Sequence, residues 1–548
     1  MQKTPQPGRK SRDLSSFTHC VWLAPAGSCQ YCLGALTIHQ HRVRPLQLLS
    51  SRLLVTQKDR RCGNPRICAG HETLIRPIDQ AARLVFRGCE YGLDVVALVG
   101  ERHMQGHKSF GEIHEELTDK GVLISRRHVL NLFRLYLSLV AARTLNSEVV
   151  QALMKAQGRL VLSMDAVRFD EVSPPLYVVR EVISGEILLT QRVEKADTEN
   201  LIEFLRKLEC FTSYVVGIVT DKEKAMILAV ATVFPGIPHQ YCQTHFFMNL
   251  VKPMDSDLAA LSSGVEAVTK GVREIEQRLG VEKTVTPEEC ALAKKICAAV
   301  RITGKSRGDK LFHPASLKRF TQISNLHAKL EESVTKKGGK WPLLFWLLAR
   351  LALIKEWAEL ALRLSRQVEI VRDIAHLLNV EDPGKVVKAR LTNYLGEIRK
   401  NLELPEQATD VARKQFSLHV IAVTERFWPG LFACYDVKEL PNNNNDLESF
   451  FRTVKWHQRR AQGKKSTAGG PLESFAPLFV QLWPKLKERP ELQSLLDGLS
   501  AEEVKRARDG LQALAEPARI RRSFIRDSDA QVHDALAEWE NHEPPTKG

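Results

Sequence analysis

The stretch from Arg159 to His245 constrains the fold of this chain more than any other. Within it, two short apolar runs each end in an aspartate, Asp165 and Asp221. A continuous apolar run bounded by turn signals predicts a strand buried on both faces of a sheet. If the two strands lie side by side, their terminal carboxylates come close together. Because adjacent carboxylates repel, such a pair favours divalent cations between them.

The elements between the two aspartates predict an α/β fold. Leu176 to Ser184 and Glu186 to Val193, joined at a glycine, are typical of a hairpin. Asp197 to Cys210 predicts a helix with Asp197 or Thr198 as its N-cap, leading into the strand that ends at Asp221. Three strands, a helix and a strand, with acids ending the first and fourth strands, is the layout of the ribonuclease H-like fold.

Two further motifs complete a family resemblance. Cys242-x-x-His245 follows the second aspartate, and Asn-Asn-Asp-Leu-Glu448-Ser-Phe-Phe comes late in the chain. With Asp165 and Asp221, these motifs resemble the DDE-type transposases, in particular the Mutator-like and bacterial insertion-sequence group. The resemblance covers roughly Arg159 to Gln458 and implies an active site of three acids. In that family the third acid starts a helix packed on the sheet, so it maps onto Glu448, with Asp446 as the alternative.

The resemblance implies a two-metal reaction on DNA. Asp165, Asp221 and Glu448 are expected to hold two Mg²⁺ ions, or Mn²⁺, about 3.5–4 Å apart, with Asp165 bridging them. The reaction is DNA strand cleavage and transfer at the ends of a mobile element. A plainer interpretation of Asp446 and Glu448 is a capping acid and a solvated acid at a helix start.

Cys242 and His245 allow three interpretations. Their spacing of three favours neighbouring side chains on one helical turn. The resemblance implies that they support the active site. A zinc site is a second interpretation, with only two ligands at hand, and a buried cysteine beside a surface histidine is the third.

The amino-terminal segment carries two cysteine pairs, Cys29-x-x-Cys32 and Cys62-x5-Cys68. Two pairs of thiols can close a tetrahedral Zn²⁺ site in a small module. The second pair is wide, so His71 is a substitute ligand, and four unrelated free thiols are the alternative. A zinc-ribbon-like module with basic flanks is favoured.

The segment after this module predicts a helix-turn-helix. Ile78 to Gly100 predicts one or two helices, Phe110 to Lys120 another, and Gly121 a stop. Ser125 then caps a helix through Tyr136. The first turn would present four side chains to DNA bases, as in such motifs: Ser125, Arg126, Arg127 and His128. A plain helical hairpin with a solvated basic face is the alternative.

Composition favours a polyanionic partner. The 548 residues hold 79 Lys and Arg against 64 Asp and Glu, a net charge of +15, and residues 1–75 hold eleven basic residues against three acidic ones. No signal peptide is evident, and the most apolar run, Pro342 to Ile354, is too short to span a bilayer. We expect a cytoplasmic protein, nucleoid-associated if bacterial, with eleven reduced cysteines, that binds double-stranded DNA as a homodimer or higher oligomer and has no membrane partner.

Six segments follow from these patterns. They are a probable zinc module (1–75), a helix-turn-helix domain (76–150), the first part of the ribonuclease H-like core (151–245), an all-helical insertion (246–440), the last core helix (441–470) and a basic helical region with a disordered tail (471–548). Arg452 and Lys455 on the last core helix are expected to contact DNA. Two other functions are a domesticated DNA-binding regulator and a ribonuclease H-like nuclease acting on structured DNA or RNA.

Overall fold

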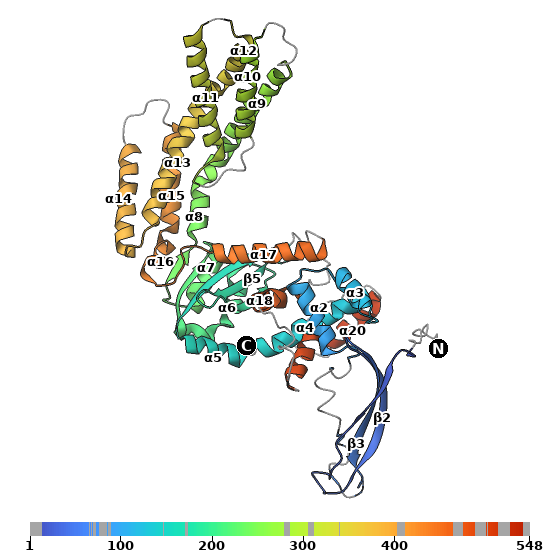
Figure 1. Ribbon diagram of the computed structural model, residues 1–548. Coiled ribbons are helices and arrows are strands. Elements are labelled where there is room, and N and C mark those ends of the chain that lie inside the picture. Colours follow the sequence, from blue (N-terminus) through green and yellow to red (C-terminus); the bar gives the residue numbers. More distant parts are fainter. Residues whose placement is uncertain are drawn as a thin grey trace. The chain divides into compact units, whose positions relative to one another are not determined.

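The computed structural model describes residues 14–540 except 65, 67, 70–72, 76–84, 86–88, 146, 170–173, 279–284, 305–311, 339, 403–410, 464–474, 488–499, 501 and 513–526. His71 and the end of the expected disordered tail, residues 541–548, therefore lie outside the described residues. The chain is a mixed α/β protein of two compact units (Figure 1). Among the described residues no helix is both long and apolar enough to cross a membrane.

The first unit comprises residues 1–160, 164–214 and 446–548. It begins with a three-stranded sheet in the order β1-β3-β2, in which β3 pairs parallel with β1 and antiparallel with β2. The strands are β1 (Thr18–Leu23), β2 (Leu36–Gln47) and β3 (Arg52–Cys62). Figure 1 shows β2 and β3 as a long ribbon.

Helices follow this small sheet: α2 (Leu93–Met104), α3 (Phe110–Asp119), α4 (Arg126–Thr144) and α5 (Ser147–Gln157). Ser125 caps α4 as predicted, since its side chain accepts from the N–H of His128. Gly121 has a φ of +81°, which favours glycine after a helix end. The connector between α3 and α4 is held by the small sheet, because the Gln47 side chain bonds both the N–H and the carbonyl oxygen of Leu123.

One helix prediction here was wrong in its extent, and another falls partly on residues outside the described ones. Of the one or two helices expected from Ile78 to Gly100, the described part is α2, which begins at Leu93 directly after Gln47 bonds to the backbone of Glu90 and Gly92. The helix expected to end at Tyr136 continues to Thr144, since buried apolar residues persist along it.

The remaining strands form a five-stranded sheet in the order β6-β5-β4-β7-β8. They are β4 (Leu160–Val167), β5 (Leu176–Glu181), β6 (Ile187–Arg192), β7 (Val215–Thr220) and β8 (His239–Tyr241). The predicted hairpin is β5–β6, and its turn is closed by the Glu181 carboxylate, which accepts from the N–H of Ser184. Residues 161–163 of β4 belong to the second unit and the rest of the strand to the first.

The first unit continues with α6 (Thr198–Arg206), the 3₁₀ turn η1 (Glu209–Tyr214), α17 (Asn445–Gln462), α18 (Ala476–Lys487) and α20 (Ser528–Glu540). Asp197 caps α6 as predicted, by accepting from the N–H of Asn200. One apolar core joins α2–α4 to α17 and α18, and its largest side chains include Phe133, Phe479 and Trp483.

The second unit comprises residues 161–163 and 215–445, and beyond β8 its described residues are helical. Its core runs from Tyr241 to Phe432 and is built from leucine, valine and isoleucine at helical spacing. The helices are α7 (Lys224–Val233), α8 (Gln243–Val251), α9 (Asp255–Arg278), α10 (Pro287–Gly304), α11 (Ala315–Lys337), α12 (Pro342–Ala352), α13 (Ala358–Leu378), α14 (Gly384–Leu402), α15 (Val411–Phe427) and α16 (Ala433–Asp436). Single 3₁₀ turns join some of them: η2 (Lys252–Met254), η3 (Leu353–Trp357) and η4 (Trp428–Gly430).

Candidate active site and metal centres

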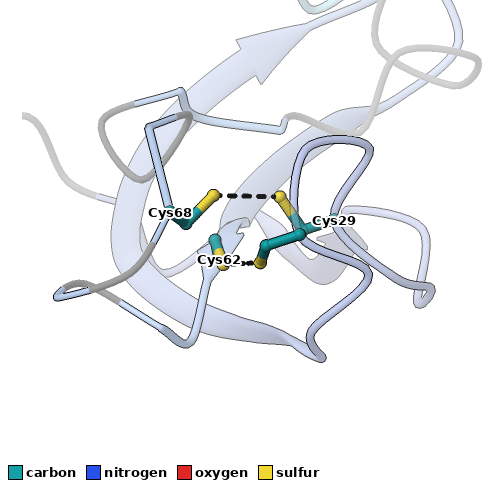
Figure 2. Close-up of side chains that lie close together, drawn as sticks. Cys29, Cys62 and Cys68 are labelled. Carbon is teal, nitrogen blue, oxygen red and sulfur yellow. Dashed lines mark hydrogen bonds between the residues drawn. The ribbon is translucent and has the colours of Figure 1, made fainter.

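Four thiols of the amino-terminal sheet converge on one point. Cys29 and Cys32 lie on the loop between β1 and β2, Cys62 ends β3, and Cys68 follows it. Their sulfur atoms all lie within 4.8 Å of one another, with 3.5 Å between Cys29 and Cys68 and 3.3 Å between Cys32 and Cys62. Figure 2 shows the thiols of Cys29, Cys62 and Cys68 turned toward one another. We call these four residues the tetrathiol cluster.

Backbone donors around the tetrathiol cluster suit a metal-bound thiolate. The N–H of Tyr31 donates to Cys29 Sγ at 3.5 Å, and the N–H of Asn64 donates to Cys62 Sγ at 3.4 Å. The Tyr31 N–H is the main cause that lowers the pKa of the Cys29 thiol to about 7. Four sulfur ligands at about 2.3 Å from a tetrahedral ion are the donor set of structural zinc. The tetrathiol cluster therefore fits Zn²⁺, and the wide spacing of the second pair is accommodated without His71.

Two of the arginines that flank this cluster in the sequence are engaged in contacts within the small sheet. The guanidinium of Arg60 donates to the carbonyl oxygens of Ala24 and Leu36, so it stabilises the loop that carries Cys29. Arg44 lies over the ring of Trp22 at 5.5 Å. These two arginines hold the small sheet together, whereas Arg66 is exposed.

A second group of metal-ligating side chains forms at the ends of β7 and β8. Within the described part of the chain, Asp221, Cys242 and His245 offer ligand atoms within 4.8 Å of one another. We call them the mixed cluster. Asp221 directly follows β7, and Cys242 directly follows β8 as the N-cap residue of α8. His245 lies in the first turn of α8, as the spacing of three predicts.

Asp221 and His245 face each other closely. Asp221 Oδ1 and His245 Nδ1 are 2.8 Å apart, and the carboxylate, followed by Cys242, raises the pKa of His245 to about 10. The two atoms are buried and neither has a partner in hydrogen-bonding geometry, so the contact is electrostatic and not a directed hydrogen bond. Sequence reasoning missed this pairing because Asp221 was assigned to magnesium alone.

The segment before α17 is bonded to the mixed cluster. The N–H of Asn444 donates to Cys242 Sγ at 3.5 Å, and the carbonyl oxygen of Asn442 accepts from the N–H of Gln243 at 2.8 Å. Ser163 Oγ of β4 donates to Asn444 Oδ1 at 2.9 Å. Ser163 and Asn444 were not singled out in the sequence. Their signals were the position of Ser163 two residues before Asp165 and the run of asparagines before Glu448.

The other predicted acids belong to the first unit. Asp165 lies near the end of β4 and is 9% exposed, and its Oδ1 accepts from the N–H of Ala166 at 2.7 Å. Glu448 lies half-buried in the first turn of α17, while Asp446 is exposed. Burial and then Arg459 lower the pKa of Lys455, and the charge of Asp165 opposes this shift, so Lys455 lies within electrostatic reach of Asp165.

The remaining predicted DNA contacts differ in their exposure. Ser125, Arg126, Arg127 and Arg452 are exposed and available to a partner. His128 is half-buried and its ring lies 4.7 Å from that of Tyr91. Within the predicted set, Arg126, Arg127 and Arg452 therefore offer the accessible positive charge.

Comparisons with known proteins add one distant likeness. No family model matches this chain, and no curated protein matches its sequence. A solved structure described as a Drosophila P element transposase strand transfer complex aligns with 74% of this chain and 94% of its own, at 11% identity and a TM-score of 0.31. At that TM-score the likeness assigns neither a fold nor a function.

Proposed function

We propose that this protein is a DDE-type DNA transposase with a ribonuclease H-like core. In this proposal Asp165, Asp221 and Glu448 form the active site and the protein cleaves and transfers DNA strands at the ends of a mobile element. The observation that carries the proposal is the anchoring of the Asn442–Asn445 segment to the mixed cluster and to Ser163. Those bonds fix the start of α17, whose first turn carries Glu448, and Ser163 lies on the strand that carries Asp165.

The acids fit a hard divalent cation. All three are carboxylates, which Mg²⁺ prefers, and Mn²⁺ accepts the same ligands. Asp165 is nearly fully buried, and burying an ionised carboxylate costs free energy unless positive charge compensates it. When bound, two such cations activate the attacking water or 3′-hydroxyl and stabilise the leaving oxygen. Lys455 beside Asp165 supplies positive charge to the same region.

Substitution of the three acids tests this function. Asp165→Asn, Asp221→Asn and Glu448→Gln keep the side-chain shape and remove the metal-binding charge. Each should abolish cleavage and strand transfer on DNA carrying the element ends, with Mg²⁺ present, while DNA binding is retained. Asp446→Asn is the matched control, because Asp446 is exposed in the same helical turn. If Glu448→Gln stayed active and Asp446→Asn were inactive, the third acid would be Asp446.

DNA reading by α4 is the second part of the proposal. Arg126→Ala or Arg127→Ala should weaken binding to the element's terminal repeat by about 1–3 kcal/mol and bring it closer to binding of random DNA. Arg66→Ala is the control, since the loss of a phosphate contact would weaken binding to both DNAs alike and make binding less dependent on salt. Anisotropy titrations of the full chain on both DNAs measure the difference. If both α4 variants lost the same binding free energy on the two DNAs, base recognition would have to lie elsewhere in the chain.

Two other functions make different predictions. A DNA-binding regulator derived from a transposase would bind the terminal repeat without cutting it. A ribonuclease H-like nuclease would cut structured DNA or RNA irrespective of the repeat. The exposed Arg126 and Arg127 favour sequence-directed binding of DNA over the nuclease function.

A further inference from the structure

We propose that the mixed cluster binds a zinc ion through Asp221 Oδ1, Cys242 Sγ and His245 Nδ1. The ion would hold the Asp221 carboxylate in a fixed position. Zinc binding by these residues stands apart from the proposed transposase activity, whereas the benefit to catalysis rests on it. The inference starts from three ligand atoms that lie within 4.8 Å of one another.

The backbone places the three side chains at one edge of the sheet. β7 and β8 pair in parallel, with Thr220 opposite Tyr241, and the N–H of Cys242 donates to the Thr220 carbonyl oxygen at 2.9 Å. Asp221 and Cys242 are the next residues of the two strands, so they leave the sheet side by side. The first turn of α8 then brings His245 to Asp221. Cys242 is fully buried, which fixes this arrangement.

Two buried polar atoms of the mixed cluster face each other without hydrogen-bonding geometry. Asp221 Oδ1 and His245 Nδ1 are 2.8 Å apart and form an ion pair when the imidazole is protonated. A metal ion bound by both atoms would take the place of that proton between them. Tetrahedral zinc with ligands at about 2.0–2.2 Å separates nitrogen and oxygen ligands by roughly 3.3 Å. The observed pair needs to open by only about half an ångström to accept the ion.

The donor set selects zinc over magnesium. Magnesium takes oxygen ligands in octahedral geometry, whereas thiolate and imidazole are ligands of Zn²⁺. The N–H of Asn444, which donates to Cys242 Sγ, is the kind of outer contact that orients a metal-bound thiolate. Three protein ligands leave a fourth position, which water can fill.

Such an ion would give the two oxygens of the Asp221 carboxylate different roles. Oδ1 is buried and faces His245, while the side chain as a whole is 25% exposed. The exposed part therefore belongs to its other atoms. One oxygen can be held by zinc while the other remains for the catalytic cation of the proposed reaction. The Cys-x-x-His motif would thus be a positioning device for a catalytic acid.

Zinc content of the purified full chain tests the site without any measurement of activity. Cys242→Ser and His245→Asn should each lower bound zinc, measured by plasma mass spectrometry, by about one equivalent per chain. Cys434→Ser is the matched control. Cys434 Sγ accepts from the side chain of Gln243, which lies in α8 beside Cys242, at 3.7 Å, but Cys434 itself lies outside the mixed cluster. Its zinc content should equal that of the unaltered protein.

Cobalt substitution identifies the ligands and guards against misfolding. In Co²⁺-loaded protein, Cys242→Ser should remove one thiolate-to-cobalt absorption band and leave the stronger band of the tetrathiol cluster. Asp221→Asn keeps the local shape and should weaken Co²⁺ binding at the mixed cluster alone. This variant tests the site even if Cys242→Ser does not fold. Unchanged metal content and spectra in the folded variants of Asp221, Cys242 and His245 would overturn the proposal, and His245 would then be a protonated partner of Asp221.

Discussion

The tetrathiol cluster and the mixed cluster differ in what surrounds them. The tetrathiol cluster closes the end of a small sheet whose other core consists of Trp22, Leu46, Val55 and Val85. The mixed cluster sits where β7 and β8 meet α8, against a core that extends through the whole helical region. The first region has little apolar burial of its own, whereas the second has a great deal.

This difference predicts two uses of zinc. A module with a small core would depend on its metal for folding, because metal binding supplies the free energy that burial does not. A metal bound on a well-packed framework would add little to folding and would act on the position of its ligands. The tetrathiol cluster offers four protein ligands, which would close a tetrahedral site, whereas the mixed cluster offers three, which would leave one position open.

The largest expected effect is the loss of the tetrathiol cluster. Cys62→Ser combined with Cys68→Ser should remove about one zinc per chain and unfold residues 14–75, because zinc contributes about 10–16 kcal/mol to small modules of this kind. Hydrogen exchange of the full chain should then show β1–β3 unprotected and α8 unchanged. Cys20→Ser, on β1 outside the cluster, is the control. Full protection of β3 in the double variant would show that the sheet folds without metal.

Local patterns were sufficient to predict that the four cysteines of the tetrathiol cluster come together, with the close Cys-x-x-Cys pair as the main signal. They were also sufficient for the hairpin β5–β6 and for the caps Asp197 and Ser125, which depend on neighbouring residues. For the mixed cluster, local spacing paired Cys242 with His245 but did not join Asp221 to them. Its third member, Asp221, lies 21 residues before Cys242 and joins it only through the parallel pairing of β8, a three-residue strand too short to give a sequence signal.

Long-range packing accounts for the other differences. The backbone just before α2 is bonded to Gln47, which lies more than 40 residues earlier, so no local pattern could indicate where α2 begins. The core that α2–α4 share with α17 and α18 joins segments more than 300 residues apart. Periodicity shows that a helix face is apolar, but it does not show which helix will cover that face.

A group of three histidines in the first unit, His103, His107 and His457, provides a contrast with the two clusters. His103 and His457 are fully buried, yet the group is not among the metal-ligating clusters of the described residues. His107 Nδ1 and His457 Nδ1 are 2.7 Å apart, and His103 Nδ1 lies 2.9 Å from the Lys108 carbonyl oxygen. The rings pack against Phe110, Phe133, Phe479, Trp456 and Trp483. Burial, the largest cause, lowers the pKa of His103 to about 4 and that of His457 to about 2.

Acid should therefore destabilise the first unit. Unfolded histidine binds a proton near pH 6.5, but folded His103 and His457 do not, so stability present above pH 6.5 falls as the pH drops toward 4. Each residue contributes about 1.4 kcal/mol per pH unit in this window. Hydrogen exchange of α2 and α17 between pH 7 and 5.5, corrected for intrinsic rates, measures the loss. His457→Gln should reduce the loss, and an identical pH dependence in that variant would contradict the assignment.

The smallest expected effect concerns the anchoring of α17 at the mixed cluster. Ser163→Ala removes a hydrogen bond to Asn444 Oδ1 between two buried side chains, at a cost of about 0.5–1.5 kcal/mol. Exchange should quicken in residues 442–448 and at the start of α8, while the tetrathiol cluster keeps its zinc and its protection. Ser449→Ala, exposed one turn into α17, is the control and should change neither. The contrary outcome is that residues 442–448 of Ser163→Ala are as protected as those of the control. In that outcome the bonds from Asn442 and Asn444 to the α8 turn are sufficient to hold the start of α17, and β4 contributes nothing to that anchoring.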